Sequence, residues 1–361
     1  MAEKFLFYID SMCFGGANRV MCNLVNHFSS QGIDVILIND ISLPEDMGEY
    51  EVSPLVKRIY LNVHSKSLLT SNIKRIRKIR TIVKTEHPDA VISFMGPPNF
   101  RMLFATVGLR CRKIVSVRND PYMEYGKGMA KALANVIFML ADGCVFQTKQ
   151  AAEYFTPAIR RKSKIIFNPV GNQFYHVKRA ENPRNIITVG RLMTQKNHKL
   201  LIEAFSKIAK EFPDENLVIY GEGELRDTLE TQSKKLGLEG RVKLPGATTN
   251  VAEKLSSAKV FVLSSDYEGM PNALMEAMAV GVPVISTDCP CGGPAMLIEE
   301  DSQGILVPCQ NAEKLANALR LLLESQDLRL MVGESCKERA LQFSPDIVFS
   351  QWKEYIEEPS K

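Results

Sequence analysis

Short hydrophobic stretches alternate with longer amphipathic stretches along the whole chain. The hydrophobic stretches are continuously apolar, which is typical of parallel strands that are covered on both faces. They lie at residues 5–9, 35–38, 90–94, 114–117, 144–146 and 164–167, and then at 186–189, 217–220, 242–244, 260–263, 284–286 and 305–307. Helical spacing of apolar positions occurs between them, for example at 17–30, 199–210, 224–236 and 312–324. This alternation predicts an α/β protein with two doubly wound parallel sheets.

The pattern is interrupted at N-P-V-G-N, residues 168–172, where Pro169 and Gly171 break it. We therefore expect an N-terminal domain over 1–172 and a C-terminal domain over 173–344, followed by a helix over 345–358. The sign of the charge changes at the same place, because residues 1–172 contain 23 Lys and Arg against 14 Asp and Glu, and the remainder contains 22 against 27. The N-terminal half is thus expected to attract anions.

Composition limits the class of protein. Eight scattered cysteines show neither metal-binding nor disulfide spacing, which favours a reducing compartment. No apolar run approaches the roughly 20 residues that cross a bilayer, and residues 5–9 read as a strand rather than a signal peptide. A cytoplasmic protein is expected.

Ligands of open α/β sheets bind beyond the carboxyl ends of the strands, so the loops that follow the strands are the candidate ligand sites. After the first strand, Gly15 and Gly16 lead into a helix, where the backbone can approach an anion closely. A purely structural turn explains them equally well. After strand 186–189, Gly190 precedes Arg191 and Lys196, two cations that could clamp a diphosphate or simply be solvated.

The most informative segment follows strand 260–263. Glu268 lies just before a predicted helix and Glu276 just inside it, and Pro271 suits the first helical turn. Gly269, Met270 and Asn272 expose backbone donors at the positive end of the helix. A carboxylate there can accept two hydroxyls of a ribose or hexose. Either glutamate alone could be a cap or a salt-bridge residue, but together they form a specific signal.

These residues resemble the GT-B-fold glycosyltransferases of family 4, also called group 1. The segment E-G-M-P-N-A-L-M-E-A-M-A-V-G-V-P-V-I-S-T, residues 268–287, is similar to the E-x7-E signature of that family. Supporting matches are G-R-L-x3-K-N-H at 190–198, Y-G-E-G-E-L-R at 220–226, F-N-P-V at 167–170 and F-G-G-A-N-R-V at 14–20. V-S-V-R-N-D-P at 115–121 resembles the subgroup that extends polyprenyl-diphosphate-linked glycans for O-antigen, capsule or glycoprotein synthesis.

The resemblance implies a donor site. Arg191 and Lys196 would bind the diphosphate of a nucleotide sugar, and Glu276 would hold the ribose hydroxyls. The donor sugar would be positioned by Glu268 and by the backbone of Gly269, Met270, Pro271, Asn272 and Ala273. Gly15 and Gly16 would approach the diphosphate from the other domain across a cleft, and residues 345–361 would complete the N-terminal domain. Glu268, Arg191 and Lys196 are thus the catalytic candidates.

The chain departs from the family in the N-terminal domain. Asn18 stands where many relatives have Glu, and Arg118 and Asn119 stand where many have His. Arg118, Asn119 and Asp120 are therefore candidates for contacting the acceptor. Residues 72–86 form a basic amphipathic pattern that includes Lys74, Arg75 and Lys78. This pattern fits a helix on anionic lipid, a contact with the acceptor's diphosphate, or a solvated face. It lacks interleaved aromatic residues, so nucleic acid is not an expected partner.

The expected function is that of a metal-independent retaining glycosyltransferase. It would transfer a hexose or N-acetylhexosamine from a UDP-sugar to an undecaprenyl-diphosphate-linked saccharide at the inner face of the plasma membrane, for lipopolysaccharide or capsule. No D-x-D occurs, and no metal or cofactor besides the donor is expected. A sugar-nucleotide epimerase of the same fold is the alternative enzyme. A non-catalytic protein that binds anionic lipid or another polyanion is the alternative from a different class.

Overall fold

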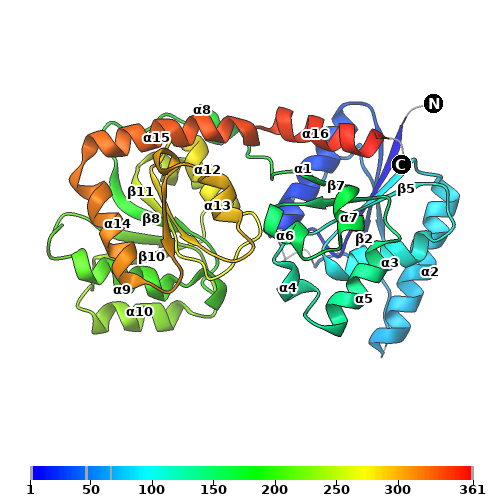
Figure 1. Cartoon of the computed structure of the whole chain (residues 1–361), viewed down its shortest axis with the longest axis horizontal. Helices are drawn as coiled ribbons and strands as arrows, with labels where there is room; N and C mark the ends of the chain where they lie inside the picture. The colour runs from blue at the N-terminus through cyan, green and yellow to red at the C-terminus, as the bar shows by residue number, and fades with distance from the viewer. Residues whose placement is uncertain (1–2, 45–47, 66, 359–361) are drawn as a thin grey trace. The chain divides into compact units, whose positions relative to one another are not determined.

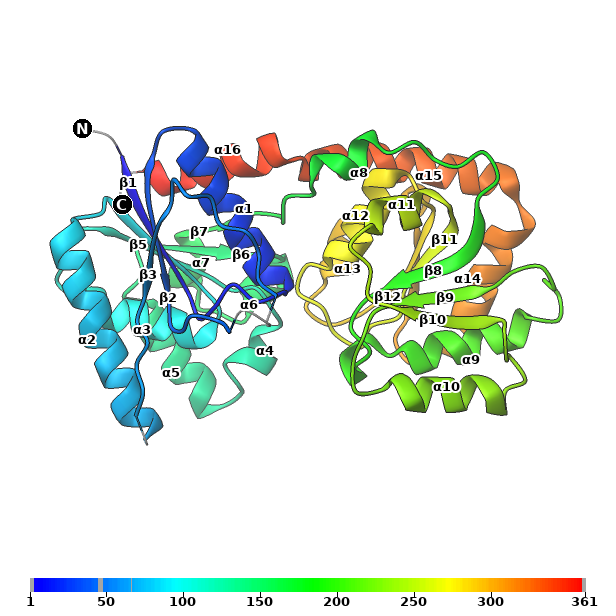
Figure 2. The same ribbon diagram turned by 180° about the vertical axis from the view of Figure 1, so that it is seen from behind.

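The computed structural model describes residues 3–44, 48–65 and 67–358. The chain forms two compact units, each built around one parallel sheet (Figures 1 and 2). The N-terminal domain comprises Met1–Pro169 together with Asp346–Lys361, and the C-terminal domain comprises Val170–Pro345. The predicted fold class, two α/β domains with parallel sheets, is therefore confirmed.

The N-terminal sheet has seven strands in the order β3-β2-β1-β4-β5-β6-β7. In chain order they are β1 (Lys4–Ile9), β2 (Asp34–Asn39), β3 (Lys57–Tyr60), β4 (Ala90–Phe94), β5 (Arg112–Ser116), β6 (Gly143–Phe146) and β7 (Ser163–Ile165). The helices are α1 (Gly16–Ser30), α2 (Leu68–Glu86), α3 (Gly96–Thr106), α4 (Pro121–Glu124), α5 (Met129–Phe138), α6 (Lys149–Glu153), α7 (Pro157–Arg161) and α16 (Pro345–Glu357). Phe5 pairs with Val35 on one side and with Ala90 on the other, so β1 is central.

One strand of this sheet was not predicted. β3 reads K-R-I-Y, and its last three residues are only half-buried. It is one of the two edge strands, so it has a neighbour on one side only, and K-R-I-Y contains no continuous apolar run. The rule that found the buried strands therefore could not find this one.

The C-terminal helix α16 supplies part of the N-terminal core. Trp352, the only tryptophan of the chain, is fully buried, and its ring centroid lies 5.6 Å from that of Phe94 in β4. The phenolic oxygen of Tyr355 accepts a hydrogen bond from the backbone N–H of Cys144 in β6 at 2.8 Å. The N-terminal core is thus completed by residues from the far end of the sequence.

The C-terminal sheet has six strands in the order β10-β9-β8-β11-β12-β13. They are β8 (Arg184–Val189), β9 (Leu217–Tyr220), β10 (Val242–Gly246), β11 (Ala258–Leu263), β12 (Val284–Asp288) and β13 (Ile305–Pro308). The helices are α8 (Asn172–His176), α9 (His198–Ile208), α10 (Arg226–Lys235), α11 (Val251–Ser256), α12 (Asn272–Val280), α13 (Gly293–Leu297), α14 (Ala312–Glu324) and α15 (Gln326–Ala340). The short 3-10 helix η1 (Thr194–Lys196) follows β8.

In each sheet the winding direction reverses between two neighbouring strands. These pairs are β1 and β4 in the N-terminal sheet and β8 and β11 in the C-terminal sheet. At such a reversal the connections leave in opposite directions and open a crevice beyond the carboxyl ends of the strands. The fold therefore marks one favoured ligand position in each domain. Within the described ranges, no helix is both long and apolar enough to span a bilayer.

Candidate functional site

The reversal point of the C-terminal sheet brings together two of the predicted catalytic residues. β8 pairs with β11, so the loops that follow them start side by side. Nζ of Lys196, from the β8 loop, lies 2.5 Å from Oε1 of Glu268, from the β11 loop. The Ser265 hydroxyl donates to the same carboxylate oxygen at 2.6 Å, and Glu268 is only 6% exposed. The pair is therefore held in place before any ligand binds.

Backbone contacts fix these two loops to each other. The Ser264 hydroxyl donates to the backbone carbonyl of Lys196 at 2.9 Å, and the N–H of Asp266 donates to the carbonyl of Gln195 at 2.9 Å. The side-chain amide of Asn197 donates to Oδ1 of Asp266 at 2.9 Å. Preorganised groups of this kind stabilise a developing charge without a reorganisation cost.

Arg191 lies in the same β8 loop and is exposed, and it forms no ion pair within the described part of the chain. A neighbouring glycine loop shapes its surroundings. A Cβ on Gly221, which has φ +152°, would lie 1.9 Å from the carbonyl oxygen of Gly190. The N–H of Leu192 donates to the carbonyl of Glu222 at 2.8 Å. The G-E-G segment after β9 is therefore more than a turn before a helix, because it supports the Arg191 loop by close backbone contact.

Helix α12 places its N-terminus directly after the Glu268 loop. The sequence predicted Pro271 in the first turn of this helix. In the structure the helix begins at Asn272, and Pro271 is its N-cap. The first backbone N–H groups of a helix have no partner inside the helix and carry partial positive charge. Glu276 lies one turn into α12 and is 4% exposed. Gly269 and Met270 are buried, whereas Asn272 and Ala273 are half-buried at the helix start.

A second glycine pair supports this loop and was missed by the sequence analysis. Gly292 and Gly293 follow β12, and α13 begins at Gly293. A Cβ on Gly293 would lie 1.9 Å from the carbonyl oxygen of Gly269. Only glycine allows this approach. Gly292 and Gly293 follow a strand and lead into a helix, as Gly15 and Gly16 do. The same sequence pattern could therefore have identified them.

His198 begins α9 and is 3% exposed. Its ring lies beside the backbone of Gly190 and Arg191, and burial, reinforced by the charge of Lys196, lowers its pKa to about 4. The residue is neutral at physiological pH and packs beneath the β8 loop.

In the N-terminal domain, Gly15 is the N-cap of α1 and Gly16 is the first helical residue. The side-chain amide of Asn18 donates to the carbonyl of Cys13 at 2.8 Å and so holds the turn that contains both glycines. Asn18 therefore has a structural contact within its own loop. The glycines follow β1, one of the two strands at which the winding of this sheet reverses.

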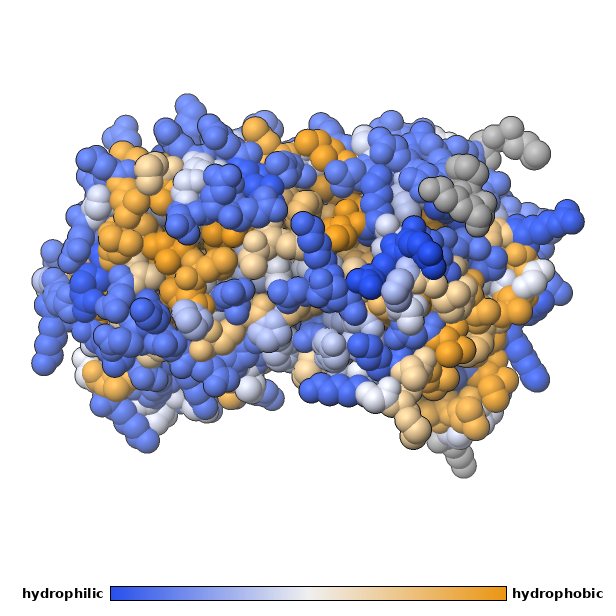
Figure 3. All heavy atoms as spheres, in the orientation of Figure 1, coloured by the Kyte–Doolittle hydropathy of each residue, from blue (hydrophilic) through white to orange (hydrophobic). Residues whose placement is uncertain are grey.

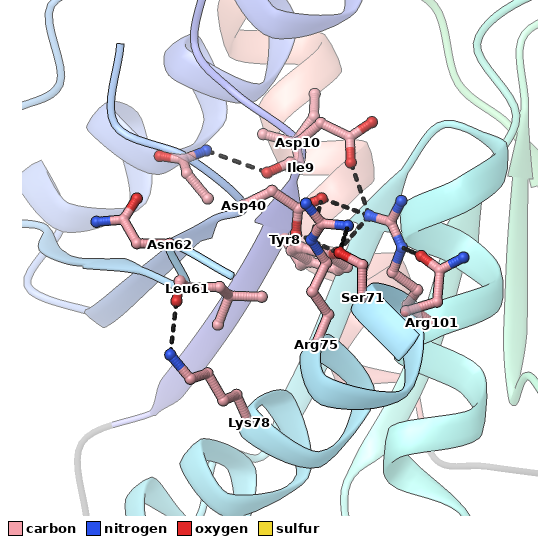
Figure 4. A network of polar contacts seen from close by, with 12 residues as sticks. Tyr8, Ile9, Asp10, Asp40, Leu61, Asn62, Ser71, Arg75, Lys78 and Arg101 are labelled. Atoms are coloured by element: carbon pink, nitrogen blue, oxygen red, sulfur yellow. Dashed lines mark hydrogen bonds and ion pairs between the residues drawn. The ribbon is translucent and has the colours of Figure 1, made fainter. Parts of the chain in front are cut away.

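A charged network lies at the same edge of the N-terminal sheet (Figure 4). Nη1 of Arg101 is 2.9 Å from Tyr8 Oη, 2.9 Å from Oδ1 of Asp10 and 2.5 Å from Oδ2 of Asp40. Nε of Arg75, from α2, lies 3.3 Å from the same oxygen of Asp40. Sequence reasoning missed the Asp40–Arg101 pair, although Asp10 and Asp40 each follow a buried strand directly.

The three basic acceptor candidates on α2 have different surroundings. Arg75 is ion-paired with Asp40, and it also donates to the Ser71 hydroxyl at 2.8 Å. Lys78 is exposed but donates to the carbonyl of Leu61 at 2.7 Å. Lys74 is exposed. Arg75 and Lys78 thus have contacts inside the domain, and Lys74 is the most freely exposed of the three.

The three candidates after β5 are also distinguished by the structure. Arg118 is buried, donates to Oδ1 of Asn168 and stacks 4.6 Å from the ring centre of Phe94. Burial lowers the pKa of its guanidinium to about 9. Asp120 is the N-cap of α4, accepting from the N–H of Tyr122 at 2.8 Å. Arg118 and Asp120 therefore stabilise the domain, and Asn119, which is half-buried, is the most accessible of the three.

Comparison with known proteins identifies the class. Residues 172–339 match the family model described as glycosyl transferases group 1, and residues 14–172 match the model described as glycosyltransferase family 4. The chain belongs to the group 1, family 4 glycosyltransferases, and its two domains have the GT-B fold.

Particular relatives are similar over nearly the whole chain. Two Campylobacter jejuni enzymes are N-acetylgalactosaminyltransferases whose names specify undecaprenol-linked diphosphate acceptors. One is 26% identical over 98% of both chains. The other is 28% identical over 94% of this chain and 96% of its own. Among solved structures, Anabaena HepE in complex with UDP has a TM-score of 0.80, with 18% identity over 97% of this chain and 98% of that chain.

Proposed function

We propose that this protein transfers a hexose or N-acetylhexosamine from a UDP-sugar to a saccharide carried on undecaprenyl diphosphate, in the synthesis of a surface polysaccharide. The observation that carries the proposal is the Lys196–Glu268 pair at the reversal point of the C-terminal sheet, with Glu276 one turn into α12. The acceptor class is supported by the two Campylobacter relatives, and the UDP carrier by the HepE complex.

Transfer breaks the bond between the anomeric carbon and the donor's diphosphate, so negative charge develops on the leaving phosphate. Lys196, Arg191 and the N-terminus of α12 supply positive charge where that phosphate would lie, and we propose that they make a metal ion unnecessary. Arg191 is suited to bidentate contact and Lys196 to a point-charge contact. Glu276 would accept the ribose hydroxyls, and Glu268 the hydroxyls of the transferred sugar.

The stereochemical proposal is retention. An acceptor hydroxyl attacks the anomeric carbon on the face from which the diphosphate departs. Its proton passes to an oxygen of the leaving phosphate, so the new C–O bond forms as the old one breaks. In this mechanism the leaving group is the base.

We further propose that the enzyme works at the inner face of the plasma membrane, where such an acceptor is anchored. The exposed Lys74 and Arg77 of α2 are available for an anionic surface or for the acceptor's diphosphate. Asn119 is available for the acceptor saccharide.

The test is a panel of UDP-sugars incubated with lipid-diphosphate glycans and read by mass spectrometry. We expect one sugar to be added to the acceptor, with an α-linkage by NMR, and with no loss of rate in chelator. Loss in chelator that manganese reverses would contradict the metal-free mechanism. Epimerised donor formed without acceptor would indicate the epimerase. Lipid binding that is lost in salt, without any turnover, would indicate the non-catalytic protein.

A further inference from the structure

Helix α5 exposes an apolar face. Met129, Leu133, Val136 and Leu140, the last lying just beyond the helix end, follow helical spacing, and they are 90%, 60%, 68% and 40% exposed. Met139 beside them is 52% exposed. The opposite face, with Ala134, Ile137 and Phe138, is buried. The helix is therefore apolar on its solvent side as well as on its core side, which is unusual for a helix that faces water.

The apolar surface continues beyond α5. Figure 3 shows hydrophobic atoms gathered over the part of the N-terminal domain where Figure 1 draws α5 and the adjacent end of α2. Phe104 of α3 is 44% exposed one turn from Phe100, whose ring packs 6.2 Å from that of Phe138 in α5. At the start of α2, Leu68 and Leu69 are 85% and 71% exposed. One helical layer of the domain thus presents apolar side chains from three helices.

Basic residues lie beside part of this surface. Residues 66–164 contain 19 Lys and Arg against 6 Asp and Glu. The ammonium group of Lys162 donates to the backbone carbonyl of Met139 at 3.1 Å. Met139 also borders a hollow of about 650 Å³ whose lining includes Arg112, Arg161, Lys162 and Lys164, with Asp142 and Glu358 as its acids. Lys127 is exposed two residues before α5 begins.

We infer that the exposed face of α5 is a membrane-docking surface that inserts into an anionic phospholipid bilayer. An apolar helix face with a basic border matches the interface of such a bilayer, where acyl chains lie beneath anionic headgroups. The inference deepens the proposed function and rests on it for the reason to dock, since the acceptor would be lipid-anchored. It assigns apolar insertion to α5, whereas the basic residues of α2 supply charge beside it.

Charge favours lipid over a second copy of this chain as the occupant. A self-association face would bring its own basic border against an identical one, and like charges in that arrangement repel. Anionic headgroups neutralise that border. The hollow beside Met139 is lined by four cations against two acids, so its net charge favours an anionic headgroup phosphate. Arg112 and Lys164 are ion-paired with Glu358 and Glu354, which leaves Arg161 and Lys162 as the cations without an ion pair among the described residues.

The experiment is co-sedimentation of the full-length protein with vesicles of equal parts phosphatidylglycerol and phosphatidylcholine, and with vesicles of phosphatidylcholine alone. We expect Leu133→Asp/Val136→Asp to bind the anionic vesicles at least about tenfold more weakly than wild type. The matched control is Leu330→Asp/Met331→Asp on α15, where the side chains are 59% and 53% exposed, and it should bind as wild type does. Arg160→Glu/Arg161→Glu should weaken binding to the anionic vesicles only.

Transfer to a water-soluble acceptor with a short lipid chain separates this inference from the proposed function. Leu133→Asp/Val136→Asp should retain wild-type transfer to that acceptor, which also shows that it is folded. Absence of transfer in every variant, wild type included, would count against the proposed function and leave the vesicle result to decide the docking surface. Vesicle binding by this variant equal to wild type would overturn the inference. The inference would also be overturned if wild type were a dimer, the Leu133→Asp/Val136→Asp variant were a monomer, and both bound vesicles equally.

Discussion

At the scale of single residues, the two glutamates of the proposed donor site should respond oppositely to loss of charge. Glu268→Gln removes a negative charge that competes with a bound diphosphate for Lys196, so UDP should bind about 2–10-fold more tightly while transfer falls. Glu276→Gln removes a carboxylate acceptor of the ribose hydroxyls, so UDP should bind about tenfold more weakly. Isothermal titration calorimetry with UDP measures both. Equal effects of the two changes would contradict the assigned roles.

Lys196 should matter more for the rate than for donor binding. Removing one preorganised group that stabilises the leaving charge costs about 2.7–4 kcal/mol, or roughly 10²–10³ in rate. We expect Lys196→Ala to lower kcat by that factor. Steady-state kinetics with Lys199→Ala, an exposed lysine three residues away, provides the control. An unchanged kcat in Lys196→Ala would remove the assignment.

His198 should make folding stability depend on pH. Its pKa is lowered from 6.5 to about 4 by burial, so between these values the unfolded chain binds a proton that the folded chain does not. Stability should therefore fall as the pH drops from 6.5 to 4, by about 3 kcal/mol in total. Urea unfolding at several pH values should show this fall in the free energy of unfolding in wild type and not in His198→Gln. His64→Gln, at an exposed position, should leave it unchanged.

The proposed residues of the C-terminal site stand out in the sequence because each lies in a short segment with its own signal. Glu268 and Glu276 are eight positions apart across a strand-to-helix junction, and Lys196 closes a loop after a strand. The pair of Asp40 and Arg101 could not be predicted in this way. The two residues are 61 positions apart, and they meet only because β2, β1 and β4 are neighbours in the sheet. Strand order is set by the packing of the whole domain.

At the scale of elements, Arg75 ties helix α2 to its domain through Asp40, whereas the adjacent Lys74 is exposed. Arg75→Ala should destabilise the protein by about 1–3 kcal/mol, because it leaves the buried carboxylate of Asp40 with one guanidinium instead of two. Lys74→Ala should change stability by less than about 0.5 kcal/mol, since Lys74 is exposed. Thermal unfolding monitored by circular dichroism tests the pair. Similar losses in both variants would contradict the contacts described.

The boundaries of elements show where pattern reading succeeds. The buried strands were predicted within one or two residues at most ends, for example β4 at 90–94 and β9 at 217–220. Helix α2 begins four residues before its predicted start, because Leu68 and Leu69 are apolar side chains that face solvent and do not extend the buried stripe. Periodicity identifies the side of a helix that packs. It does not identify a second apolar side that stays exposed among the described residues, as on α5.

At the scale of the whole molecule, each domain has its own core, and damage to one should leave ligand binding by the other intact. Trp352→Ala should destabilise the N-terminal domain by about 3–5 kcal/mol through the cavity it leaves. UDP affinity, measured at a temperature where the variant is still folded, should stay close to wild type because Lys196, Glu268 and Glu276 all belong to the C-terminal domain. Calorimetry measures both the stability and the UDP affinity. A large loss of UDP affinity would contradict the prediction that UDP binding depends on the C-terminal domain.

The position of α16 in the sequence also has a consequence for biogenesis. A ribosome completes the N-terminal sheet early, but the tryptophan that seals its core emerges only after the entire C-terminal domain has been made. The nascent first half must therefore wait with an open apolar groove beside Phe94, while the second half already has every residue that it needs. The core of the first domain can therefore close only after the second domain has been synthesised.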